Sequence, residues 1–171
     1  ANIQARIIQV GEYYTEQKVD IDKVQIDLKK GAGEIYGLKL YNPSEYQEKY
    51  TLTIERLIFK FDPKSLNEKV ININGIELYG SKFYIESMNN NNKIKVTNFE
   101  ELYQLLNSKI ALIRDRKRQK SEVFINSEEI TLMNSQIVSL VDTSLNKSIT
   151  ENSTKMVLKP VGGETGLPAS L

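Results

Sequence analysis

The side chains best suited to chemistry in this chain are carboxylates, because the sequence contains no histidine and no cysteine. Asp20, Asp22 and Asp27 lie in the first segment that reads as a strand, and paired carboxylates can act as general acid and base. Alternation along a strand puts them mostly on its solvated face, with no apolar run to desolvate them. Glu128 and Glu129 fall in a predicted turn. We therefore predict surface carboxylates, no catalytic residues and no enzymatic activity.

The missing residue types also limit metal and cofactor sites. A Ser-His triad, a thiol nucleophile, a disulfide and a zinc site with His or Cys ligands are all excluded. A calcium loop needs oxygen ligands at alternate positions, but Val24 and Ile26 interrupt the series that Asp20 and Asp22 begin. The glycine-rich turn at residues 29–33 lacks the spacing and the Lys-Ser/Thr of a phosphate loop. We predict neither a metal nor a cofactor.

Tyrosines gather near two predicted strand ends. They are Tyr36, Tyr41, Tyr46 and Tyr50 around Pro43, with Tyr79 and Tyr84 near Gly80. An amphipathic ring suits the rim of an apolar groove or a membrane interface. Packing at strand ends is the simpler interpretation, and we favour it over a ligand role.

A basic cluster follows the central predicted helix. Its members are Arg114, Arg116, Lys117, Arg118 and Lys120. Such residues could contact anionic lipid headgroups at a membrane surface. A solvated helix end, where basic residues oppose the macrodipole, is the favoured interpretation because Asp115 interrupts the run.

Three segments share a strand pattern that would position these side chains. Two apolar residues one apart are followed by a two-residue gap and two more apolar residues one apart. The copies are Val19, Ile21, Val24, Ile26; Leu52, Ile54, Leu57, Phe59; and Ile71, Ile73, Ile76, Leu78. The gap shifts the alternation, so both halves face the same side only if a bulge or bend lies between them. The pattern predicts a curved sheet that is apolar on one side.

The remaining elements follow from periodicity and turn residues. Helices are predicted at residues 2–16, which carry one apolar face, and at 98–116, after a Thr97–Glu100 capping box. Strands are predicted at 18–29, 34–41, 50–61, 69–79, 82–87, 121–126, 128–133 and 136–142, with a last strand around Met156 and Leu158. Residues 143–153 predict a loop, and the tail after Pro160 has no regular period.

The fold class expected from these elements is α+β, with a curved, mostly antiparallel sheet, an N-terminal amphipathic helix and one central helix. The 171 residues suit one domain, divided into the helix at 1–17, the sheet at 18–159 and a flexible or docking tail at 160–171. A net charge of +1 argues against nucleic acid as the main partner. No apolar stretch is long enough to span a bilayer, and the start at Ala1 leaves room for a membrane anchor that has been removed.

Several segments together resemble bacterial AsmA-like proteins. The strand Val19–Leu28 is followed by Gly33–Pro43, which runs from Gly37-Leu38 to Asn42-Pro43. Tyr50–Phe61, Ile71–Gly80, Phe124–Asn134 and the Gly-Gly-Glu-Thr-Gly-Leu-Pro tail that begins at Gly162 are similar in order and length. The resemblance covers most of residues 18–171.

This resemblance implies an inner-membrane protein with an N-terminal anchor and a domain in the bacterial periplasm. It implies a curved sheet with an apolar concave face, as in chorein-type lipid-transfer proteins, and a role in outer-membrane lipid homeostasis or envelope assembly. Phospholipid and envelope proteins are the partners it implies, and the family supplies no catalytic residues.

Two hypotheses of function follow. In the first, the apolar face is a groove that binds an acyl chain, lined by Val24, Ile26, Leu38, Leu40, Leu57, Phe59, Ile76 and Leu78. The same residues could instead close into a core against the central helix. In the second, the chain is a structural or assembly module that binds protein and no lipid, through sheet edges or its tail.

Overall fold

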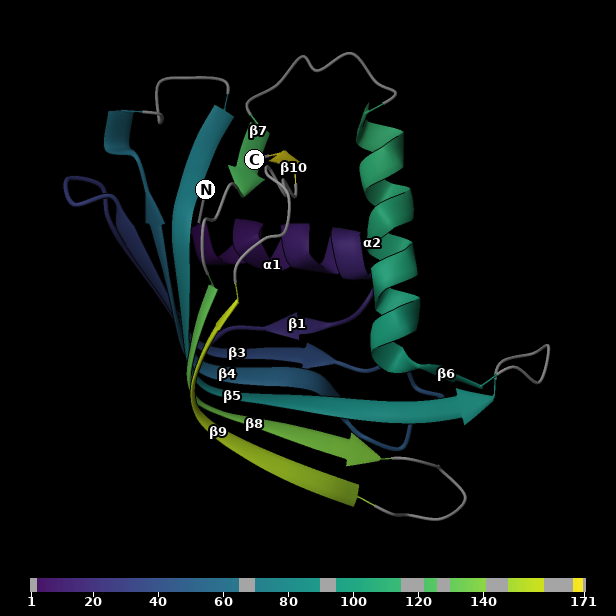
Figure 1. Cartoon of the computed structure of the whole chain (residues 1–171). Helices are drawn as coiled ribbons and strands as arrows, with labels where there is room; N and C mark the ends of the chain where they lie inside the picture. Colours follow the sequence, from purple (N-terminus) through teal and green to yellow (C-terminus); the bar gives the residue numbers. More distant parts are fainter. Residues whose placement is uncertain are drawn as a thin grey trace.

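The chain folds into two helices and an open, strongly curved and mostly antiparallel sheet, so the predicted α+β class is confirmed (Figure 1). This computed structural model describes residues 3–64, 70–89, 95–114, 122–125, 130–140, 148–158 and 168–170, and side chains at 3–64, 73–89, 95–112 and 132–138. Both helices lie on the concave side of the sheet (Figure 1).

The elements have the following bounds. They are α1 (Ile3–Thr15), β1 (Val19–Asp20), β2 (Lys23–Asp27), β3 (Ala32–Tyr41), β4 (Tyr50–Phe61), β5 (Val70–Asn89), β6 (Lys95–Thr97), α2 (Asn98–Arg114), β7 (Glu122–Ile125), β8 (Ile130–Leu140), β9 (Ser148–Leu158) and β10 (Pro168–Ser170).

The long strand β5 is the centre of the sheet. It pairs antiparallel with β4 on one side, and β4 continues to β3, which carries β1 and β2 on its far edge. On its other side β5 pairs in parallel, first with β7 and then with β8, and β9 follows β8 in antiparallel register. Parallel neighbours need a long crossover. Helix α2 lies within the connection from β5 to β7.

The sheet bends along one line that crosses its strands. Three residues in β3, β5 and β8 have left-handed backbone: Gly37 (φ 64°), Gly80 (φ 63°) and Asn134 (φ 51°). The flanking register places Gly37 beside Glu55 of β4, Glu55 beside Gly80, and Gly80 beside Asn134. Left-handed residues change strand direction, and glycine and asparagine adopt that conformation most readily. Their alignment bends all four strands at the same place.

The bend also explains the two-residue gap in the strand pattern. In β3, Ile35 and Leu40 are both buried on the concave side although five positions separate them, which simple alternation forbids. In β4, Glu55 and Arg56 fill the gap at the bend. The Asn74-Gly75 gap lies elsewhere, at a bulge where the β4–β5 register shifts. The predicted bulges and bends are therefore confirmed at these two gaps. The third gap, Asp22-Lys23, lies at the break between β1 and β2, so the single strand predicted at 18–29 is divided in two.

Two predicted strand breaks are wrong. Gly80-Ser81 was expected to separate strands at 69–79 and 82–87, and Asn134-Ser135 to separate 128–133 from 136–142. Instead β5 and β8 each run without a break through these positions. A single left-handed residue redirects a strand, and the backbone pairing continues on both sides of it.

Helix α1 packs on the edge of the sheet around a buried cluster of Val19, Ile21, Ile35 and Leu40. Ile7 and Ile8 of α1 pack against this cluster. Gly11 permits the approach, because a Cβ there would lie only 3.2 Å from a methyl carbon of Val19. The predicted helix at 2–16 is thus present, with bounds that differ by a residue where it is described.

Helix α2 begins where the capping box predicted. The Glu100 amide donates to Thr97 Oγ1 at 3.0 Å, which satisfies an otherwise unpaired N–H of the first turn. Leu102 of α2 packs against the buried cluster, and the Phe99 ring lies 6.4 Å from that of Phe83 in β5. The helix is described as far as Arg114, so the predicted end at residue 116 lies outside the described residues.

The C-terminal part of the chain contains more strand than the sequence predicted. Strand β9 begins at Ser148, within the segment expected to be a loop, because its backbone pairs along almost the whole of β8. The end of the tail is also paired, since β10 is antiparallel to β7. A polar segment of this kind forms a strand because a neighbouring strand pairs with it, so its own sequence gives little indication of strand structure.

Candidate functional site

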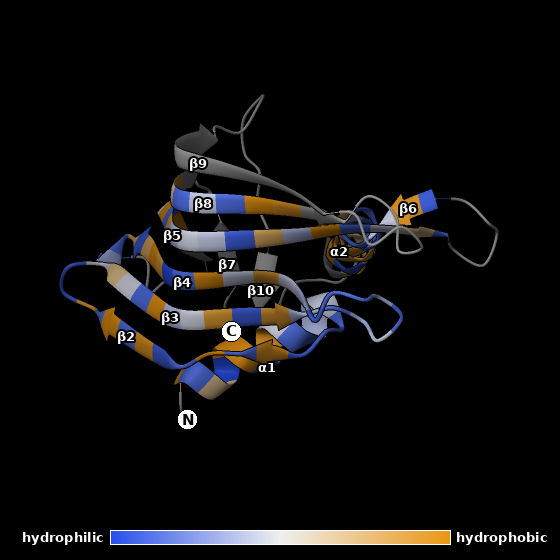
Figure 2. Cartoon of the chain, turned by 90° about the horizontal axis from the view of Figure 1, so that it is seen from below, coloured by the Kyte–Doolittle hydropathy of each residue, from blue (hydrophilic) through white to orange (hydrophobic). Residues whose placement is uncertain are grey.

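The eight predicted groove residues lie on four cross-strand rows of the concave side, two on each side of the bend. In one row the register aligns Val24, Ile35, Leu57 and Leu78. In the next it aligns Ile26, Gly33, Phe59 and Ile76. Leu38 and Leu40 lie on the concave side beyond the bend. Figure 2 shows strands β2, β3, β4, β5 and β8 side by side, with hydrophilic and hydrophobic bands alternating along them.

The structure divides this set in two. Five of the residues, Val24, Leu38, Leu40, Leu57 and Phe59, belong to the buried cluster or pack against it together with residues of both helices. For these five the closed-core alternative describes the packing. Ile26, Ile76 and Leu78 are half-buried and are not part of that cluster among the described residues.

Close packing between strands supports the second row. The Phe59 ring lies directly over Gly33, where an added Cβ would come within 2.1 Å of the ring. Ring and glycine are register partners, so the aromatic side chain covers backbone that glycine leaves bare. This contact fixes Phe59 beside Ile76 on the concave face.

In β5 and β8 the first concave position beyond the bend carries a small side chain. Ser81 of β5 is fully buried and Ser135 of β8 is 5% exposed. They lie in the same cross-strand row as Leu38 and Ile54. Small residues suit the inner side of a sharp bend, where opposing side chains converge.

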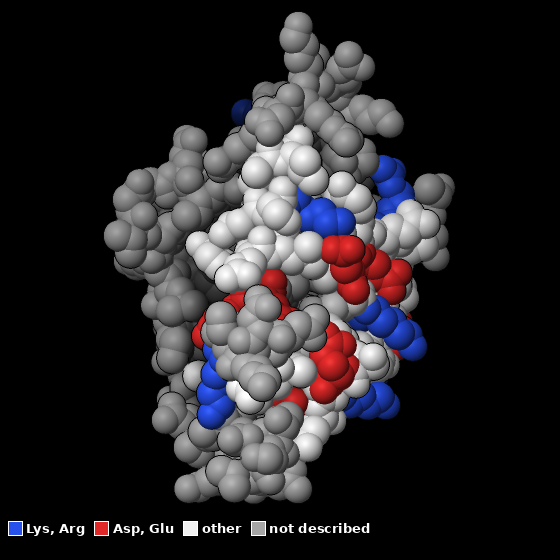
Figure 3. All heavy atoms as spheres, turned by 90° about the vertical axis from the view of Figure 1, so that its right-hand side faces the viewer, with Lys and Arg blue, Asp and Glu red and all other residues white. Residues whose placement is uncertain are grey.

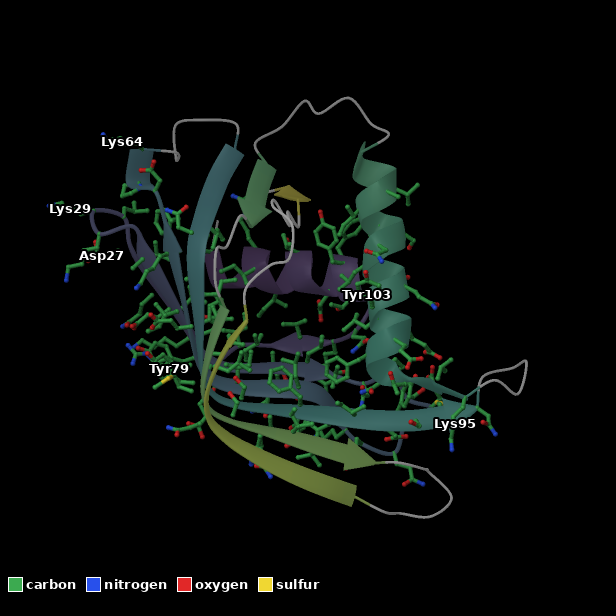
Figure 4. The ribbon with its side chains drawn as sticks, in the orientation of Figure 1. Asp27, Lys29, Lys64, Tyr79, Lys95 and Tyr103 are labelled. Carbon is green, nitrogen blue, oxygen red and sulfur yellow. The ribbon has the colours of Figure 1, made fainter. Side chains whose placement is uncertain are left out.

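The convex face carries a row of stacked cationic and aromatic side chains. The register aligns Lys23, Tyr36, Arg56 and Tyr79. The Arg56 guanidinium lies 5.9 Å from the ring centre of Tyr36 and 5.5 Å from that of Tyr79. Tyr79 projects outward at the bend (Figure 4).

The Glu34 carboxylate is hydrogen-bonded to two members of this row, and its pKa is clearly lowered. It accepts hydrogen bonds from the Tyr36 hydroxyl and from Arg56. The Tyr36 bond first, and then Arg56, lower the pKa of Glu34, because both stabilise the charged form. The same contacts raise the pKa values of Tyr36 and Arg56. A partly exposed ion pair with a tyrosine hydrogen bond explains the shift without an active-site cleft.

A second group of aromatic and basic residues lies at the far end of these strands. The rings of Tyr41 and Tyr50 are 5.0 Å apart, and the Lys49 ammonium lies within 6 Å of both ring centres. The Tyr41 hydroxyl donates to Asp20 Oδ2 at 2.6 Å, which raises the pKa of Tyr41 to about 12. Tyr84 stacks next to Tyr50. Packing at strand ends, the favoured interpretation of the sequence, describes these three tyrosines.

Sequence reasoning missed a buried polar network at this end of the sheet. Asn98, only 3% exposed, donates to Asn42 Oδ1 (2.9 Å) and to the Tyr84 carbonyl (2.8 Å), and accepts from the Glu86 amide (3.0 Å). The Glu86 carboxylate, fully buried, accepts from the amides of Gln47 (2.9 Å) and Glu48 (2.8 Å).

The network continues to the end of α1. Asn42 Nδ2 donates to the carbonyls of Glu48 (3.0 Å) and Tyr50 (2.9 Å), and its Oδ1 accepts from Thr51 Oγ1. Gln17 Nε2 donates to Thr51 Oγ1 (2.8 Å) and to the Tyr41 carbonyl (2.6 Å). The Asn42-Pro43 dipeptide is the visible signal in the sequence at this point, and its residue types do not predict these hydrogen bonds.

The other predicted site residues are dispersed or not described. Arg114 ends α2, and Arg116, Lys117, Arg118 and Lys120 lie outside the described residues. On the face shown in Figure 3, acidic and basic side chains of the described residues are interspersed. Among the residues that the structure describes, no group of three acidic side chains is arranged to hold a metal ion.

The described helices also bear on the membrane. Neither α1 nor α2, as far as each is described, is long and apolar enough to cross a bilayer.

No protein-family model matches the chain, and no curated protein matches it.

Proposed function

We propose that this chain is an AsmA-like domain of the bacterial envelope, anchored to the inner membrane and facing the periplasm, that holds a phospholipid acyl chain on the concave face of its sheet. The proposal rests on one observation: the apolar rows of the concave face extend beyond the buried cluster to the half-buried Ile26, Ile76 and Leu78. The bend at Gly37 and Gly80 gives that face its curvature.

Apolar contact alone is sufficient for this role. Removing apolar surface from water contributes roughly 25 cal/mol per Å². An acyl chain lying along Ile76 and Leu78 would remove their remaining exposed surface from water and would need no polar partner in the sheet. The absence of histidine and cysteine is consistent with a binding role without catalysis.

Native mass spectrometry of the full-length protein, purified from a bacterial membrane fraction in mild detergent, tests the proposal. Co-purified phospholipid is the expected result. A bare mass at every detergent concentration would contradict it.

A matched pair of variants locates the bound lipid. Ile76→Asn places a polar group on the concave face, whereas Ile58→Asn, on the adjacent strand, changes the opposite face, where Ile58 lies between Glu34 and Glu77. We expect Ile76→Asn to lose most of the lipid and Ile58→Asn to retain it. Equal retention in two folded variants would exclude the concave face as the binding site.

The second candidate function is an assembly module that binds an envelope protein and no lipid. The convex row of Lys23, Tyr36, Arg56 and Tyr79 favours it, because tyrosine and arginine are enriched at protein interfaces. A bare mass together with a protein crosslinked through this row would support it. The tail is a weaker docking element, since Pro168–Ser170 already pairs with β7.

A further inference from the structure

A pocket of about 250 Å³ lies where the end of α1, the β3–β4 loop and the first turns of α2 meet. Its walls include three apolar side chains, Pro43, Leu102 and Leu105. One liquid water occupies about 30 Å³, so the pocket has room for roughly eight non-hydrogen atoms. That volume suits a small organic molecule or a single headgroup.

Most polar groups around the pocket are already engaged. Thr15 Oγ1 donates to the Gly11 carbonyl (2.6 Å), and the Gln17 amide group donates to Thr51 and to the Tyr41 carbonyl. Asn98 makes the three hydrogen bonds of the buried network. These residues form a fixed wall and leave their donors unavailable to a ligand.

Tyr46 is the exception. Its side chain lines the pocket, the residue is only 6% exposed, and its hydroxyl makes no hydrogen bond of normal geometry within the described part of the chain, although the Glu101 carboxylate lies near it. A buried hydroxyl without a partner is costly, and a ligand that bonds to it would remove that cost. Burial and the nearby Glu101 carboxylate raise the pKa of Tyr46, so the hydroxyl stays neutral.

The charge of the pocket selects the kind of ligand. Glu16 and Glu101 both line the pocket. The Lys109 ammonium is paired with Glu16, with Nζ 3.9 Å from Oε2, and it lies 4.3 Å from the Tyr13 ring centre. No lysine or arginine of the described residues pairs with Glu101. An anionic ligand would be repelled, whereas a cation would supply the missing partner.

From these observations we propose that the pocket binds a primary ammonium group on a short aliphatic chain, with Glu101 accepting from the ammonium, Tyr46 hydrogen-bonded at its side, and Leu102 and Leu105 packed against the methylenes. Ammonium groups donate hydrogen bonds and accept none, which matches carboxylate and hydroxyl oxygens as partners. The site is separate from the concave row around Ile76 and does not depend on lipid binding there.

Isothermal titration of the full chain with cadaverine tests the proposal, with 1-pentanol and pentanoate as neutral and anionic probes of similar size. We expect saturable binding of cadaverine alone. Binding of all three probes with equal affinity, or of none, would overturn the proposal.

Three variants test the assigned contacts. Glu101→Gln removes the charge at almost constant shape and should weaken cadaverine binding by about tenfold or more, because a charge-assisted hydrogen bond is lost. Tyr46→Phe removes only the hydroxyl and should weaken it by roughly three- to tenfold. The control Glu100→Gln, the neighbouring exposed carboxylate on α2, should leave binding unchanged. If Glu100→Gln weakens binding as much as Glu101→Gln, the effect is nonspecific charge attraction and the pocket is not the site.

The ammonium could belong to a soluble amine or to an ethanolamine lipid headgroup. Co-sedimentation with phosphatidylethanolamine–phosphatidylcholine vesicles, with and without cadaverine, separates these sources. Vesicle binding that cadaverine displaces identifies the headgroup as the source. Cadaverine binding without vesicle binding identifies a soluble amine.

Discussion

At the scale of single residues, the clearest electrostatic feature is the coupling of Glu34 to Tyr36 and Arg56 on the convex face. Each partner stabilises the carboxylate, and the tyrosine hydrogen bond has the largest effect on its pKa. Because the pKa of Glu34 is lowered on folding, the contribution to stability is present above the unfolded-state pKa and is lost as pH falls through the folded-state pKa. The row therefore strengthens the sheet at neutral pH and weakens in acid.

Tyr36→Phe tests this coupling. Removing the hydroxyl should raise the pKa of Glu34 toward its ordinary value, and the acid-side loss of stability should become smaller. A carboxyl ¹³C NMR titration measures the pKa, and urea unfolding at several pH values below 6 measures the stability.

Tyr79→Phe is the matched control for that prediction. The Tyr79 hydroxyl donates a hydrogen bond to Glu77 (2.9 Å), so its removal in Tyr79→Phe takes no hydrogen bond away from Glu34. A similar rise in the pKa of Glu34 in both variants would show that general changes in the face, and not the Tyr36 hydrogen bond, control it.

At the scale of elements, the bend depends on a few backbone conformations. Gly80 has left-handed backbone, and a Cβ there would lie 2.5 Å from the Glu55 side chain. Gly75, five positions earlier in the same strand, has open space within 4 Å of where its Cβ would be, and its φ is not left-handed. The backbone conformation and the close contact with Glu55 therefore require glycine at position 80, whereas neither applies at position 75.

We therefore expect Gly80→Ala to destabilise the protein by about 1–2 kcal/mol, the cost of a left-handed conformation for a residue with a Cβ. Gly75→Ala should change stability by less than about 0.5 kcal/mol. Urea unfolding followed by circular dichroism measures both. Equal effects would mean that the left-handed conformation at position 80 does not constrain the sheet.

Much of this element structure could be predicted from the sequence. The two-residue gaps at Glu55-Arg56 and Asn74-Gly75 predicted bends or bulges, and the capping box placed the start of α2 at Asn98. The continuity of β5 and β8 was not predicted, because glycine and asparagine occur both in turns that end strands and in bulges that bend them, and residue type alone does not distinguish the two. Strand β9 was missed because its polar segment is ordered by pairing with β8.

The candidate sites were predicted less completely, for a similar reason. Apolar alternation identified the concave face, but whether Leu57 packs in the core or stays open depends on where both helices lie. The roles of Asn98 and Tyr46 depend on contacts between residues far apart in the chain, such as Asn98 with Asn42. A single sequence carries no local signal for them.

At the scale of the whole molecule, one end of the structure is held together by the buried network around Asn98. Through Asn42 and Thr51 the network connects α2 to the β3–β4 loop and to Gln17 after α1. A satisfied buried network of this kind stabilises one arrangement of the surrounding elements, because each member left unpaired would be costly.

Asn98→Ala should accordingly destabilise the protein by roughly 2–4 kcal/mol, since it leaves the Glu86 amide and the Tyr84 carbonyl without their partner. Asn107→Ala, at an exposed position of the same helix, should be neutral or slightly stabilising, because alanine has the higher helix propensity. Thermal unfolding compares the two. A loss below about 0.5 kcal/mol for Asn98→Ala would contradict a structural role for the network.

At the bend line, each of the four strands contains one residue more than the simple alternation of its side chains requires. In β3, concave-side residues carry odd numbers before Gly37 and even numbers after it, and the same inversion occurs at Glu55, Gly80 and Asn134. If these four residues were deleted together, the alternation would continue across the bend line in each strand with the same residues facing inward, and only the separate bulge at Asn74-Gly75 of β5 would remain. The curvature of this molecule is therefore encoded as one additional residue in each of four neighbouring strands, and the hydrophobic pattern on either side is that of an ordinary flat sheet.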